Sequence, residues 1–126
     1  MSIYIGTGGY SDTDFLGILY PADTKKTEFL TEYSRHYATV EINSSFYAPL
    51  GRKAYEGMLK KSNGQLKFSI KIHQDFTHRL TATAETAQAF LQAIEPILAA
   101  DCLAALLIQF PHGFDRTVAH RQYLAT

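Results

Sequence analysis

Short apolar segments alternate with amphipathic segments along this chain, and this alternation constrains the fold more than any other feature. Strand signals lie at residues 3–5, 39–42, 66–72 and 103–110, and helix signals lie at 25–37, at 52–61, from Thr83 onward and at 117–124. Strands that alternate with helices in this way are typical of parallel βαβ units. The sequence therefore predicts an α/β protein with a parallel sheet of about four strands and three to four helices.

Three of these segments carry more detailed expectations. The helix at 52–61 is followed by a turn signal at Asn63-Gly64, and Thr83 is the expected N-cap of the helix that follows it. The apolar run from Leu103 to Phe110 predicts a strand buried on both faces, because strands inside parallel sheets are apolar throughout. The helix after Thr83 has an apolar stripe at helical spacing that contains Pro96. Because proline lacks the amide donor, we expect Pro96 to kink this helix or to end it early.

The alternation fits two architectures, a small doubly wound sheet or half of a (β/α)8 barrel. A complete barrel needs about 250 residues. The 126 residues suffice for one domain, and no internal repeat or interdomain linker divides them. We therefore treat residues 1–126 as a single domain.

Composition excludes several classes of partner. Lys and Arg number 12 and Asp and Glu number 12, so the net charge is zero and nothing indicates binding to nucleic acid or to an acidic membrane. The longest apolar run is too short to span a bilayer, and no signal peptide is visible. The single cysteine, Cys102, cannot form an internal disulfide, which favours a reduced, cytoplasmic setting.

Polar side chains cluster where the expected strands end, and parallel α/β proteins place ligands at this edge of the sheet. The stretch from Val40 to Tyr47 is the clearest case, because an apolar strand that contains Glu41 breaks there into a polar turn. The candidate catalytic residues are Glu41, Lys71 and His78, and the candidate ligand-binding residues are Gly8, Tyr10, Asn43, Ser45, Tyr47 and Gln109.

These residue types suit proton transfer on a small polar ligand. Glu41 would be a general base and Lys71 would anchor an anion, although adjacent strands could equally pair the two as a structural ion pair. His73 and His78 flank Asp75 at a spacing that is not diagnostic of a metal site, so we assign no metal ligand. The motifs identify no cofactor, because the run from Gly6 to Gly9 is not a dinucleotide fingerprint and better fits a tight turn.

Several short motifs, taken in order, resemble the N-terminal part of the YecE-like family, also called domain of unknown function seventy-two. They are Ile5–Tyr10, Tyr20-Pro21, Val40–Tyr47, Phe68–Lys71, Thr77-His78 and Gln109–Pro111. The resemblance covers the chain from Ile3 to about Phe114 and implies the N-terminal half of a TIM-like barrel, with no established activity. Family members are about twice as long and usually carry Trp, which this chain lacks, so the chain resembles a truncated member.

Two functional hypotheses follow from these features. In the first, the domain binds or transforms a small polar or phosphorylated metabolite at the carboxyl ends of its strands. In the second, it is a non-catalytic half-barrel that assembles with itself or with a partner, because the first and last strands would leave open sheet edges.

Overall fold

A computed structural model describes all residues from Met1 to Thr126. One sheet holds four parallel strands, and their order in space follows their order along the chain. The strands are β1 (Gly6–Thr7), β2 (Thr39–Ile42), β3 (Lys67–Lys71) and β4 (Leu103–Leu107). The helices are α1 (Phe29–Tyr33), α2 (Ser44–Tyr47), α3 (Arg52–Ser62), α4 (Gln74–Thr77), α5 (Ala84–Ala99) and α6 (Val118–Ala125), with short 3-10 turns at Thr13–Phe15 and Lys26–Glu28.

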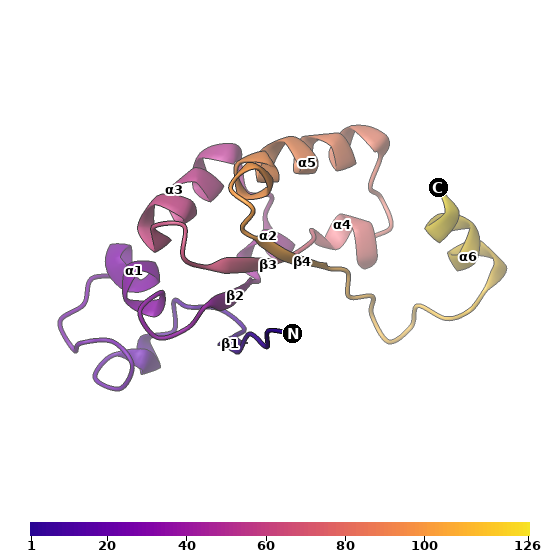
Figure 1. Ribbon diagram of the computed structural model, residues 1–126. Coiled ribbons are helices and arrows are strands. Elements are labelled where there is room, and N and C mark those ends of the chain that lie inside the picture. Colours follow the sequence, from indigo (N-terminus) through magenta and orange to yellow (C-terminus); the bar gives the residue numbers. More distant parts are fainter.

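The strand order decides between the two expected architectures. In a doubly wound sheet the strand order reverses at a switch point, and helices cover both faces. Here every strand lies beside the next one in the chain, and α1, α3 and α5 lie on one side of the sheet (Figure 1). The protein is therefore half of a TIM-like barrel, as the sequence resemblance implied. None of the helices combines the length and the apolar character that a membrane span requires.

Alternation along β2 and β3 separates the two faces of the sheet. Val40 and Phe68 are buried against the helices, whereas Glu41 and Ser69, which are register partners, are half-buried on the opposite face. We call this opposite face the inner face, because it would line the interior of a complete barrel. The main core lies between the sheet and the helices, and its members are Tyr20, Phe29, Leu30, Tyr33, Val40, Ile42, Tyr55, Met58, Leu66, Phe68, Ile70, Ile94, Ile97 and Cys102.

The helix limits follow local signals in the sequence. Thr83 caps α5 as predicted, because its hydroxyl accepts from the Thr86 amide while the Thr86 hydroxyl accepts from the Thr83 amide. Asn63 ends α3 in the left-handed conformation at φ 52°, which confirms the turn expected at Asn63-Gly64. The α-helix predicted at 25–37 covers only α1 in the structure. A 3-10 turn precedes α1, and the amides that follow it bond to the Glu32 and Tyr33 carbonyls in the 3-10 pattern.

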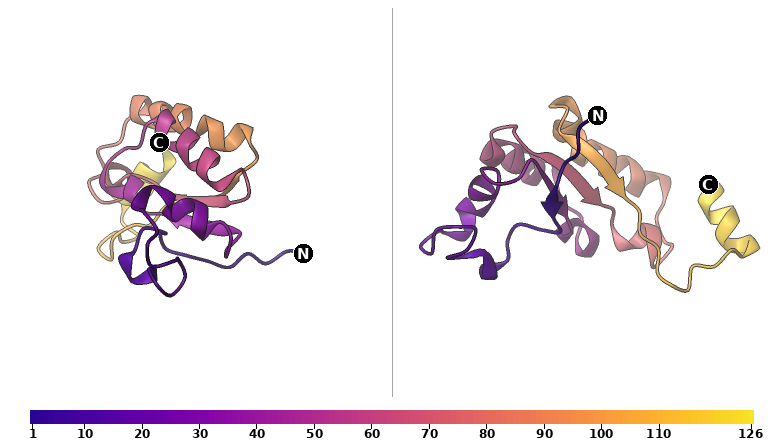
Figure 2. Two further views of the ribbon diagram at one scale, coloured as in Figure 1. Left: turned by 90° about the vertical axis from the view of Figure 1, so that its left-hand side faces the viewer. Right: turned by 60° about the horizontal axis from the view of Figure 1, so that its bottom comes forward.

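The strand predicted at 3–5 is wrong, since β1 pairs only at Gly6 and Thr7. A side chain on Gly6 would collide with the Thr39 carbonyl, so this glycine is the point at which the chain can approach β2. Residues Ile3 to Ile5 remain exposed and extend away from the helices (Figure 2).

Two further expectations are corrected. The strand expected at 103–110 ends at Leu107 and is not buried on both faces, because β4 lies at the sheet edge and Leu106 is exposed, as is Ile108 just beyond the strand. Helix α5 does not end early at Pro96 but continues to Ala99. Pro96 lies in the last turns and is itself buried with Ile97, so packing offsets the hydrogen bond that proline removes.

Candidate functional site

Glu41 lies in the middle of the inner face, beside the glycine turn that follows β1. A Cβ atom placed on Gly8 would be 3.6 Å from Asn43 Nδ2 and 3.8 Å from Glu41 Oε1. A shallow cavity of about 210 Å³ opens here, and its lining includes Gly8, Glu41 and Ser69. The structure thus brings together three of the predicted site residues, Gly8, Glu41 and Asn43.

A second group of predicted residues gathers around Phe46 in α2. The Lys71 ammonium lies 4.5 Å from the centre of the Phe46 ring, a cation–π contact. The rings of Tyr47 and His78 both meet Phe46 edge to face, with centroids 5.1 Å and 4.9 Å away. Phe46 therefore positions three candidate side chains, and the sequence analysis did not single it out.

The structural ion pair between Glu41 and Lys71 does not form. The ion pairs of the chain lie elsewhere, at Arg35–Glu32, Arg52–Glu56, Arg52–Glu95, Lys67–Asp101, His73–Asp75 and Arg79–Asp75. The two half-buried charges share the inner face of adjacent strands, yet neither is neutralised by a neighbour of opposite sign. This leaves a carboxylate and an ammonium free to meet a ligand.

Ser45 binds the carboxyl ends of two strands, and Thr77 contacts the imidazole of His78. The buried Ser45 hydroxyl donates to the Lys71 carbonyl at 2.5 Å and lies 3.2 Å from the Ile42 carbonyl, so α2 is tied to the ends of β2 and β3. The buried Thr77 hydroxyl lies 2.8 Å from His78 Nδ1, which fixes the orientation of the exposed imidazole. The Ser45 hydroxyl therefore already donates its proton to a main-chain carbonyl.

Tyr10 and Gln109 lie apart from these two groups. The Tyr10 ring packs against the core, burial raises the pKa of its hydroxyl, and its carbonyl accepts from the Tyr20 hydroxyl at 2.6 Å. Gln109 is exposed two residues beyond Leu107, the register partner of Lys71. No group of three or more metal-ligating side chains forms in the structure.

The Tyr33 hydroxyl holds the glycine turn against β2. It accepts from the Thr7 amide at 2.8 Å and donates to the Thr39 carbonyl at 2.8 Å. The Thr7 hydroxyl in turn donates to the Gly9 carbonyl at 2.6 Å, and Gly9 adopts φ 111°, which favours glycine. These bonds place Gly8 beside Glu41 and agree with the tight turn expected from the sequence.

The motifs and the fold of this site recur in known proteins. The family model described as "Protein of unknown function DUF72" matches residues 4–126. This chain belongs to the DUF72 family. The assignment confirms the resemblance seen in the sequence, because YecE-like and DUF72 are names for the same family.

Individual relatives agree with the family assignment. The chain is 33% identical to the UPF0759 protein YunF of Bacillus subtilis over 97% of its own length and 44% of that protein. Its fold matches a crystal structure of a DUF72 family protein from Thermotoga maritima with a TM-score of 0.80, at 28% identity over 97% of this chain and 49% of that one. A DUF72 family protein from Enterococcus faecalis, 22% identical, shares the fold with a TM-score of 0.75 over 94% of this chain and 43% of that one. The chain thus spans about half the length of these relatives.

Proposed function

We propose that this protein binds a small polar metabolite that carries an anionic group such as phosphate, at the carboxyl edge of the inner face. One observation carries the proposal: Glu41 and Lys71 share this face without forming an ion pair. Charges withdrawn from water are costly unless something pairs with them. A ligand with one anionic and one hydroxyl group would supply both partners.

Each residue has a distinct part in this proposal. Lys71 binds the anion, and its contact with the Phe46 ring orients the ammonium without neutralising it. Glu41 accepts a hydrogen bond from a ligand hydroxyl and is placed to act as a general base. His78 offers a second group for proton transfer, while Asn43, beside Glu41 at the glycine turn, orients the ligand.

The test compares the wild type with Glu41→Gln by calorimetric titration, with glycerol 3-phosphate and inorganic phosphate as probes. A hydrogen bond to a charged acceptor contributes about 1.5–3 kcal/mol, so Glu41→Gln should weaken glycerol 3-phosphate roughly 10- to 100-fold. Binding of inorganic phosphate, which has no carbon-bound hydroxyl, should not weaken. The variant should keep the melting temperature of the wild type.

A matched control is Glu32→Gln, which removes a carboxylate that pairs with Arg35 away from the inner face. It should leave the affinity for both probes unchanged. Equal affinity of Glu41→Gln and the wild type for glycerol 3-phosphate would refute the role of Glu41. Unfolding of Glu41→Gln would instead make Glu41 a structural residue.

A second candidate function is assembly of this half-barrel with a second copy of itself. It rests on the unpaired outer edge of β4 and on exposed apolar side chains at both sheet edges, with Ile108 55% and Ile5 73% exposed. Light scattering on a sizing column tests it. A dimer mass that persists on dilution supports assembly, whereas a monomer mass at every concentration contradicts it.

A further inference from the structure

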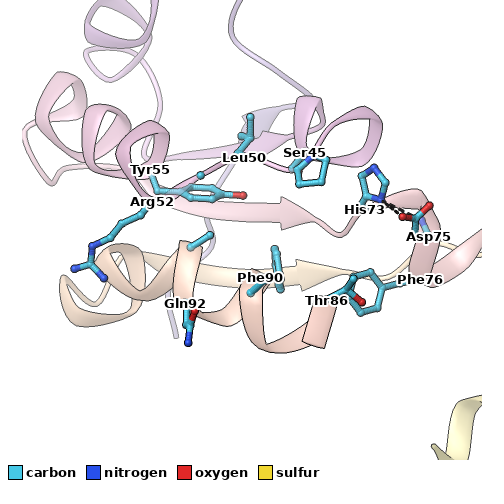
Figure 3. A pocket seen from close by; sticks show the side chains of 14 residues that line it. Ser45, Leu50, Arg52, Tyr55, His73, Asp75, Phe76, Thr86, Phe90 and Gln92 are labelled. Atoms are coloured by element: carbon cyan, nitrogen blue, oxygen red, sulfur yellow. Dashed lines mark hydrogen bonds and ion pairs between the residues drawn. The ribbon is translucent and has the colours of Figure 1, made fainter. Parts of the chain in front are cut away.

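A cavity of about 690 Å³ lies on the helical side of the sheet, between α3 and α5 (Figure 3). Its volume falls within the range of about 300–1,000 Å³ that is usual for small-molecule sites. Its walls are mainly rings and short apolar side chains, among them Leu50, Tyr55, Phe76, Phe90 and Ala93. Of the predicted site residues only Ser45 lines it, and Glu41, Lys71 and His78 do not, so the cavity is distinct from the inner-face site.

The Tyr55 hydroxyl is the unusual group in this cavity. Tyr55 is only 1% exposed, yet its hydroxyl has no hydrogen-bond partner, whereas the hydroxyls of Tyr20, Tyr33 and Tyr123 all donate to main-chain carbonyls. In this structure, every side-chain oxygen or nitrogen that solvent cannot reach has a hydrogen-bond partner. The Tyr55 oxygen must therefore border the cavity, and Figure 3 shows it directed into the space between α3 and α5.

His73 adds a second polar group at the end of the cavity near the strand termini. Its Nδ1 lies 3.3 Å from both the Asp75 amide nitrogen and Asp75 Oδ2. As the side-chain cap of α4, Nδ1 accepts from the Asp75 amide, so the ring carries its proton on Nε2. His73 and Tyr55 then each offer a hydrogen-bond donor.

The charged side chains at the cavity wall each have a partner of opposite sign within the protein. Arg52 contacts Glu56 at 2.9 Å and Glu95 at 2.7 Å. Asp75 is paired with Arg79 at 3.1 Å. Because no cation or anion remains unpaired at the wall, the cavity suits a neutral occupant rather than an ion.

We propose that this cavity binds a neutral, ring-shaped molecule that bears a carbonyl oxygen, and that the Tyr55 hydroxyl donates a hydrogen bond to that oxygen. The ring lies against Phe90 and Leu50, where apolar contact supplies most of the binding. Burial raises the pKa of Tyr55 to about 12, so its hydroxyl keeps its proton at neutral pH and remains a donor.

The test titrates isotope-labelled protein with acetophenone and with ethylbenzene, which share a ring but differ in the carbonyl. Amide resonances of Tyr55 and Phe90 report binding. We expect both probes to give saturable shifts, with acetophenone bound about fivefold more tightly. Tyr55→Phe keeps the buried ring and should remove this preference by weakening acetophenone about fivefold, without affecting ethylbenzene. Ala93→Phe fills the cavity and should abolish binding of both probes.

Tyr37→Phe is the control, because it removes a tyrosine hydroxyl outside the cavity and should change neither affinity. The absence of a saturable shift with either probe would overturn the proposal. Unchanged acetophenone affinity in Tyr55→Phe would overturn the carbonyl recognition. If Ala93→Phe does not fold, the comparison of Tyr55→Phe with the wild type still tests whether Tyr55 recognises the carbonyl.

Discussion

Tyr33→Phe should destabilise the protein by detaching the glycine turn from β2 while leaving the core packed. The Tyr33 side chain is fully buried, and phenylalanine preserves its volume and its ring contact with Tyr37 at 5.1 Å. The variant removes the acceptor of the Thr7 amide and the donor to the Thr39 carbonyl. Each such loss costs about 1–2 kcal/mol when the remaining partner stays buried, so we expect a total loss of roughly 2–4 kcal/mol.

Urea denaturation measures this change, and it is large relative to a typical total stability of about 5–15 kcal/mol. Tyr37→Phe is the matched control, because the Tyr37 ring packs beside Tyr33 but the Tyr37 hydroxyl forms no hydrogen bond. Hydrogen exchange should also be faster at the Thr7 amide of Tyr33→Phe, and unchanged in the centre of β3. A loss below about 0.5 kcal/mol with unchanged exchange at Thr7 would refute the reasoning, since it would mean that the turn does not depend on this hydroxyl.

Three further changes test other parts of the structure. Gly6→Ala would drive a Cβ into the Thr39 carbonyl, so β1 should detach, and hydrogen exchange at Thr7 should become as fast as in an open chain. Thr83→Ala should cost about 1 kcal/mol in thermal unfolding and Thr83→Ser much less, because only the serine keeps the cap. Burial raises the pKa of Tyr55 to about 12, so above pH 10 the unfolded chain ionises this hydroxyl before the folded protein does, and stability should fall as pH rises from 10 to 12. The fall measured by urea denaturation should be smaller in Tyr55→Phe but not absent, because burial also raises the pKa values of Tyr10, Tyr20 and Tyr123.

Local patterns were sufficient to predict much of this fold. Alternation located β2 and β3 to within one or two residues, because each strand buries one face and half exposes the other. Capping signals at Thr83 and Asn63 located the start of α5 and the end of α3. Strand order could not be read from alternation alone, and it was the family resemblance that favoured the half-barrel.

The errors arose where distant contacts override local preference. Residues 3–5 look like a strand, but only Gly6 allows the backbone approach to Thr39 that pairing requires. Burial of Pro96 in the last turns of α5 offsets the local cost of proline, which the sequence pattern does not reveal. An apolar run such as 103–110 predicts burial, yet β4 lies at the edge of the sheet.

The site residues chosen from the sequence stay predictions, and the structure adds how they are arranged. The rule that parallel strands present ligands at their carboxyl ends identified Glu41, Asn43 and Lys71, and the structure places them on or beside one face. The contact of Lys71 with Phe46 joins a strand to a helix 25 positions earlier in the chain, so no local signal could have revealed it.

Titration of the isotope-labelled protein with inorganic phosphate tests most directly whether Lys71 binds an anion. Lys71 and Lys67 lie on the same face of β3 at opposite ends, so Lys67→Met is the matched control for Lys71→Met. Our account predicts saturable shifts at the amides of Gly8 and Lys71 in the wild type and in Lys67→Met, with affinity at least tenfold weaker in Lys71→Met. No saturable shift in the wild type, or equal weakening by the two substitutions, would contradict it.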